Sequence, residues 1–137
     1  FHKAAMRHDE GKDHALWQRA MGAKAPPAAK TVSASNLALL NGYRHEFGSL
    51  LKSKDVVDDL VLHLIAAHHA NGRPFFNPNQ FDPEEPEEEC LCLAREAEKR
   101  FARLQSEFGP WGLAYLEAIF KRADGLASAD EGGGASE

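Results

Sequence analysis

The 137-residue chain contains little cysteine and carries no excess of positive charge. Its two cysteines, Cys90 and Cys92, are too few and too close together for a disulfide framework, and no second pair accompanies them to complete a zinc site. A reducing, cytoplasmic setting is therefore expected. The net charge of −5 excludes a general positive field that attracts nucleic acid, although it permits a local basic groove.

Long apolar runs are also missing. None reaches the roughly 18 residues that a membrane-spanning helix needs, and no signal peptide is visible, so no membrane partner is expected. The length fits one domain, predicted to cover residues 1–128, with a flexible tail at 129–137. The chain opens within a helical apolar pattern and without an N-cap, which is expected of a fragment cut from a longer protein.

Helical periodicity runs through every segment with a clear pattern, and alternating strand patterns are absent. The sequence therefore predicts an all-α fold. Residues 22–35 and 71–89, which are rich in proline or lack periodicity, are expected to be loops. The expected helices cover residues 2–9, 13–21, 44–54, 55–69, a stretch that ends at Gly109, and a last one that begins at Pro110.

The clearest helix follows Asp55, which is the predicted N-cap, with Asp58 at the capping-box position. It is apolar on nearly all sides, from Val57 through Ile65, and should therefore lie centrally. The last helix is predicted to end near Asp124 and to turn one apolar face inward, formed by Trp111, Ala114, Tyr115, Ala118 and Ile119.

Six side chains of metal-ligating type stand at or near helix ends: His8, Asp9, His45, His68, His69 and Asp124. Imidazole together with carboxylate suits Mn, Fe, Co, Ni or Zn. Neighbouring residues on a helix point about 100° apart, so that His8 can reach one ion while Asp9 bridges to a second ion bound by the other histidines. Two such ions stabilise both the attacking and the leaving oxygen of a phosphoryl displacement. Lys12, one turn after His8, can meet a phosphate there.

Four of these six side chains also have a simple structural interpretation. His68 and His69 can terminate a helix, His45 can be a buried hydrogen-bonded residue, and Asp124 can be a solvated acid. His63 is expected to be a core histidine, and His2 and His14 are expected at the surface. The order and spacing of the whole set nevertheless favour the metal interpretation.

The phrases "HDEGK", "RHEF", "HLIAAHHANGRPF" and "WGLAYLEAIFKRADGLAS" follow one another along the chain. Their order resembles that of the HD nuclease domain of the CRISPR type I helicase-nuclease, in the variant that carries this domain at its C-terminal end. The resemblance covers residues 7–128 and implies an HD-domain helical bundle. It also implies cleavage of single-stranded DNA, which the ATP-driven helicase of the same parent chain supplies after a CRISPR surveillance complex opens the duplex.

The resemblance assigns roles to individual residues. His8, Asp9 and Asp124 would hold one divalent ion, Asp9 would bridge to a second ion held by His45, His68 and His69, and Lys12 would contact the scissile phosphate or the leaving group. The family has a further histidine upstream, which this chain lacks. The first ion site should therefore be weakened or empty, and apolar surface should be exposed unless another part of the molecule or a partner chain covers it.

Contacts with DNA are expected from Lys12, Lys24, Lys30 and Arg73. The cluster of Lys99, Arg100 and Arg103 is a further candidate, although a solvated helix face is the favoured explanation for it. The acidic loop 82–89 is expected to face a partner or to repel duplex DNA. Two other functions stay open: an HD-superfamily nucleotide or cyclic-nucleotide phosphohydrolase, and a non-catalytic docking or regulatory domain.

Overall fold

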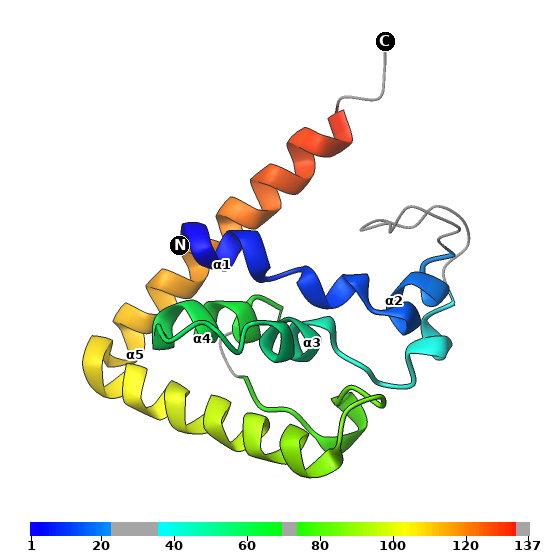
Figure 1. Ribbon diagram of the computed structural model, residues 1–137. Coiled ribbons are helices and arrows are strands. Elements are labelled where there is room, and N and C mark those ends of the chain that lie inside the picture. Colours follow the sequence, from blue (N-terminus) through cyan, green and yellow to red (C-terminus); the bar gives the residue numbers. More distant parts are fainter. Residues whose placement is uncertain (23–35, 70–73, 134–137) are drawn as a thin grey trace.

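A computed structural model of the chain describes residues 1–22, 36–69 and 74–133 (Figure 1). These residues form helices and contain no strand, so the all-α prediction is confirmed. None of these helices is both long enough and apolar enough to cross a bilayer. The elements in order are α1 (His2–Arg7), η1 (Glu10–Asp13), α2 (Ala15–Ala20), η2 (Leu37–Leu40), α3 (His45–Lys52), α4 (Asp59–Ala67), η3 (Pro78–Gln80) and α5 (Glu87–Gly133).

Helix α5 consists of two arms that meet at a sharp bend (Figure 1). Gly109 at the bend has φ 70° and ψ 161°, a conformation that favours glycine, and Pro110 starts the second arm, where no backbone N–H is required. We call residues 87–108 the N-terminal arm and residues 110–133 the C-terminal arm. The C-terminal arm continues to Gly133, so that helix extends into the predicted tail; residues 134–137 lie outside the described part.

Helix α4 lies at the centre of the fold, as its nearly continuous apolar sequence predicts. All residues from Val61 to Ala67 are buried, and Phe47 and Leu50 of α3 pack into the same core. Both arms of α5 add buried side chains, which include Ala97 and Phe120. The core therefore joins α3 and α4 to the two arms.

Helix α4 begins later than predicted. Asp58, not Asp55, is its N-cap, and the Asp58 carboxylate accepts a hydrogen bond from the Val61 N–H at 3.0 Å. Asp55 instead pairs with Arg7, and Val57, predicted to face inward, is 95% exposed. Two aspartates three residues apart offer equivalent caps in the sequence, and local pattern alone does not distinguish them.

The face of the C-terminal arm that packs inward is not the predicted one. Leu113 and Phe120 are buried, whereas Trp111, Tyr115 and Ile119 are 85%, 67% and 41% exposed. The buried face also carries Glu117 and Asp124, and these acids made it look less apolar in the sequence. In the structure the two carboxylates contact histidines of the body of the fold.

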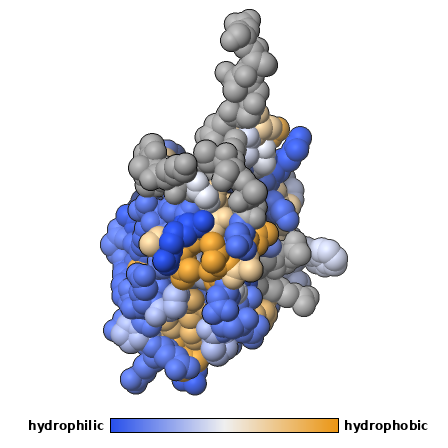
Figure 2. Space-filling view, turned by 90° about the vertical axis from the view of Figure 1, so that its right-hand side faces the viewer, coloured by the Kyte–Doolittle hydropathy of each residue, from blue (hydrophilic) through white to orange (hydrophobic). Residues whose placement is uncertain are grey.

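An apolar surface area lies on the side of the molecule that carries α2 and η2. Figure 2 shows apolar residues there, framed by hydrophilic ones, and Leu37 and Leu39 of η2 are 62% and 47% exposed. A groove of about 810 Å³ runs between η2 and the acidic loop, with Leu16, Leu40 and Phe81 among its lining residues. The predicted metal ligands His8, His45, His68 and His69 are not among its lining residues.

Candidate metal centre

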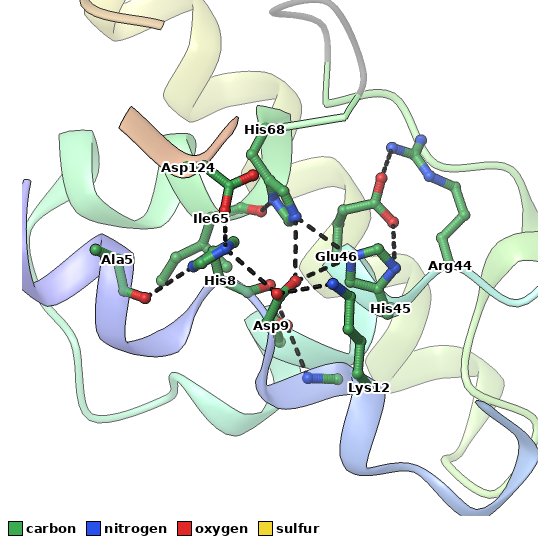
Figure 3. A network of polar contacts seen from close by, with 12 residues as sticks. Ala5, His8, Asp9, Lys12, Arg44, His45, Glu46, Ile65, His68 and Asp124 are labelled. Carbon is green, nitrogen blue, oxygen red and sulfur yellow. Dashed lines mark hydrogen bonds and ion pairs between the residues drawn. The ribbon is translucent and has the colours of Figure 1, made fainter. Parts of the chain in front are cut away.

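Four segments bring histidines and aspartates together at one place (Figure 3). The turn between α1 and η1 supplies His8 and Asp9, and η1 supplies Lys12. The first residue of α3 is His45, and the end of α4 supplies His68 and His69. Asp124 comes from the C-terminal arm of α5. The structure therefore brings all six predicted ligands, and Lys12, into one region.

Asp9 lies in the middle of this region, and its two oxygens face different neighbours. Oδ1 is 3.4 Å from His45 Nε2 and 3.7 Å from His68 Nε2. Oδ2 is 3.4 Å from His8 Nε2 and 2.7 Å from Lys12 Nζ. Burial alone would raise the pKa of Asp9, but its contacts with His45, His68 and Lys12 hold that pKa far below the usual value. The carboxylate is therefore ionised at neutral pH.

Backbone carbonyls determine which ring nitrogen carries the proton in two of the histidines. His8 Nδ1 lies 2.8 Å from the Ala5 carbonyl oxygen, and His68 Nδ1 lies 2.8 Å from that of Ile65. Because a carbonyl accepts and cannot donate, the Nδ1–H of each ring donates to it, and Nε2 is the nitrogen left to bind a metal ion. Both Nε2 atoms point toward Asp9. This is the arrangement found in metal-binding histidines, in which a second group fixes the tautomer.

The spacing around Asp9 Oδ1 suits a divalent ion. Transition metals bind nitrogen and oxygen ligands at about 2.0–2.2 Å, so that ligand atoms around one ion lie roughly 3–3.5 Å apart. His45 Nε2 and His68 Nε2 are 3.3 Å apart, and each is within 3.7 Å of Asp9 Oδ1. Oδ1 is buried and has no hydrogen-bond partner, which leaves it available as a ligand.

His69 completes this group. Burial and the nearby His68 and His45 lower the pKa of His69 to about 4, so its ring is neutral and able to ligate at neutral pH. The ligand atoms of Asp9, His45, His68 and His69 all lie within 4.8 Å of one another, and these four residues could hold a metal ion. Glu46, which pairs with Arg44, places its other carboxylate oxygen 3.6 Å from His45 Nδ1, on the side of the ring away from Asp9.

The opposite side of Asp9 offers fewer ligands. His8 Nε2 is 2.9 Å from Asp124 Oδ1 and 3.4 Å from Asp9 Oδ2. These three atoms are the possible metal ligands on this side. The Lys12 ammonium binds the same Oδ2 at 2.7 Å and would compete with a cation there. The second side of the centre is therefore the weaker one.

A second cluster, formed by His14, Asp82 and Glu84, is close enough for metal binding but has the wrong tautomer. His14 Nδ1 accepts a hydrogen bond from the Leu16 N–H at 3.1 Å, so the proton is on Nε2, which donates to Asp82 Oδ1 at 3.1 Å. This pair links α2 to the acidic loop. The prediction that His14 is a surface residue is wrong, because its side chain is only 10% exposed.

Ser49 and Tyr43 hold the His8–Asp9 turn in place, and neither was predicted to do so. Ser49 Oγ accepts from the Gly11 N–H at 2.8 Å and donates to the His8 carbonyl at 2.7 Å. The Tyr43 hydroxyl donates to the Gly11 carbonyl at 3.0 Å. A hydroxyl one turn after His45 was the only sequence signal, and it does not show which distant backbone groups it bonds.

His63 is a core histidine, as predicted. It is fully buried, stacks on Phe101, and its Nε2 lies 2.6 Å from Glu117 Oε1. Glu117 and Asp124 both belong to the C-terminal arm. The contact between His63 and Glu117 therefore holds this arm against α4. His2 is exposed, also as predicted.

The predicted DNA-binding cations are only partly described. Lys24, Lys30 and Arg73 lie outside the described residues. Arg100 and Arg103 both pair with Asp59, and Arg100 is buried. These two arginines therefore connect α5 to the start of α4, and the cluster is not an open basic patch.

In comparisons with protein-family models, with curated protein sequences and with solved structures, no match to this chain was found.

Proposed function

We propose that the chain is a metal-dependent nuclease that hydrolyses phosphodiester bonds in single-stranded DNA, as its resemblance to the HD domain of CRISPR helicase-nucleases implies. The observation that carries the proposal is the position of Asp9. One carboxylate oxygen faces His45 and His68, with His69 in the same group, and the other faces His8 and Lys12. This is the arrangement expected of a carboxylate shared by two cations.

The residues of the centre would form two ion sites that share Asp9. His45, His68, His69 and Asp9 Oδ1 would hold one divalent ion, with Mn, Fe, Co, Ni and Zn as candidates, and His8, Asp124 and Asp9 Oδ2 would hold a second, weaker one. A bound ion would supply Lewis-acid activation of water and stabilise developing negative charge on phosphate.

Lys12 would place its ammonium on a non-bridging or leaving oxygen of the substrate once that oxygen approaches Asp9. In a longer parent protein, the DNA strand would come from an ATP-driven helicase domain recruited by a CRISPR surveillance complex.

The first test is a substrate panel. The chain, loaded in turn with Mn, Co, Ni, Fe or Zn, is incubated with single-stranded DNA, duplex DNA and a set of nucleotides and cyclic nucleotides. Cleavage of single-stranded DNA in preference to duplex is expected, with at least one ion bound per chain by elemental analysis. Hydrolysis confined to the nucleotides would instead assign the phosphohydrolase function. Metal binding with no turnover, also in a parent chain that includes its helicase, would assign a docking role.

Lys12→Ala is expected to slow cleavage by a factor of roughly 10–1,000 without any loss of bound metal. Removal of the ammonium leaves Asp9 Oδ2 open to a cation while it deprives the phosphate of a positive contact. Elemental analysis and single-turnover cleavage measure the two effects separately. Loss of metal in this variant would show that Lys12 supports the site structurally and does not contact substrate. Lys52→Ala is the control, since Lys52 is more exposed and bonds Glu10 and Asp13 instead.

A further inference from the structure

The outer face of the C-terminal arm carries an apolar stripe with no partner among the described residues. We define the outer stripe as Trp111, Tyr115, Ala118, Ile119, Arg122 and Leu126, all of which are exposed. Steps of three and four residues keep them on one side of the helix over about 22 Å. In Figure 1 this arm lies at one side of the molecule, and its far end projects beyond the body of the fold. An exposed stripe of this size is characteristic of an interaction surface.

We infer that the outer stripe binds a second copy of this chain, with the two C-terminal arms packed antiparallel. The order of residues is self-complementary in that direction. If the arms cross midway between Ala118 and Ile119, Trp111 of each copy lies against Leu126 of the other. The small Ala118 lies against Ile119, which lets the two helices approach closely at the centre of the contact.

Arg122 argues for this direction of packing and for this occupant. Its side chain forms no ion pair with any described residue, and it stands between Ile119 and Leu126 in the stripe. A parallel arrangement would bring the two copies of Arg122 together, which is unfavourable. The antiparallel arrangement places each guanidinium against the ring of Tyr115 in the other copy, where a cation–π contact stabilises the pair.

The expected area indicates a modest affinity. Four aromatic side chains, two from each copy, would bury on the order of 600 Å² before the aliphatic residues are added, whereas stable complexes bury about 1,200–2,000 Å² in total. The dimer should therefore form in a concentration-dependent way. Asp124 lies on the inner side of the arm, next to His8, so dimerisation leaves the metal centre uncovered.

Sedimentation velocity over a range from about 1 µM to about 1 mM tests the inference. A shift from monomer to dimer is expected with rising concentration, and Tyr115→Glu should weaken it at least tenfold by placing a carboxylate in the stripe. Arg122→Glu should also weaken it, because the cation is lost.

The matched control is Ala102→Glu, which adds the same charge to an exposed position on the N-terminal arm. Circular dichroism verifies that each variant folds. A chain that stays monomeric at the highest concentration overturns the inference and leaves the stripe to another segment or partner. A dimer that tolerates Tyr115→Glu as well as Ala102→Glu overturns it too.

Discussion

Asp9→Ala is expected to abolish both metal binding at the His45–His68–His69 group and DNA cleavage, the latter by a factor on the order of 1,000 or more. The substitution removes Oδ1 and Oδ2 together, so both sides of the centre lose a ligand. Backbone carbonyls hold the rings of His8 and His68; these rings stay in place but no longer face a negative charge at residue 9. Elemental analysis gives the metal loss directly, independent of any activity.

Asp13→Ala provides the matched control for this substitution. Asp13 is the last residue of η1, four positions after Asp9; its side chain is 62% exposed and pairs with Lys52 at 3.4 Å. It should retain the full metal content and cleavage rate. The metal content and the cleavage rate of Asp124→Ala should lie between those of Asp9→Ala and Asp13→Ala, because Asp124 belongs only to the weaker side of the centre. Full metal content and unchanged cleavage in Asp9→Ala would refute the shared-carboxylate proposal.

The helices and the core could be predicted largely from the sequence because they depend on local patterns. The apolar run of α4 has no polar face, so a central position follows from burial alone. The bend of α5 follows from Gly109 and Pro110, whose backbone preferences are independent of their surroundings.

The orientation of the C-terminal arm could not be predicted in the same way. Its helix carries two stripes with helical spacing, and the one that packs inward contains Glu117 and Asp124. Only the positions of His63 and His8, 54 and 116 residues away along the chain, show that these acids have partners. The same holds for His14, whose bond to Asp82 crosses 68 residues. Long-range polar pairs of this kind leave no signature in local periodicity.

The candidate ligands could be selected by residue type and order, but the reason that they meet could not. Their meeting depends on the close approach of η1 to α3, which two glycines and two hydroxyl groups permit. A Cβ on Gly48 would lie 2.0 Å from the Tyr43 hydroxyl oxygen, so Tyr43 reaches the Gly11 carbonyl only across a glycine. The sequence around Gly48 does not show that this position requires glycine, because a glycine can also occur within a helix without such a close contact.

Gly11→Ala is therefore expected to destabilise the fold by about 3 kcal/mol and to disrupt the metal centre. The added Cβ would lie 1.9 Å from the His45 carbonyl oxygen and 2.8 Å from the Ser49 backbone nitrogen. Both are backbone atoms of α3, and they cannot rotate away as a side chain could. Helix α3 must shift instead, which lengthens the Ser49 bonds and moves His45 away from Asp9.

Gly125→Ala separates this effect from the general consequences of replacing glycine. Gly125 lies in the C-terminal arm, and a Cβ there would meet no atom within 4 Å, so the gain in helix propensity should stabilise the chain by about 0.5–1 kcal/mol. Urea denaturation gives both stabilities, and metal titration of the folded protein gives the affinity. Because η1 reaches α3 only where residue 11 has no side chain, wild-type stability with wild-type metal affinity in Gly11→Ala would contradict this account of how Asp9 meets His45.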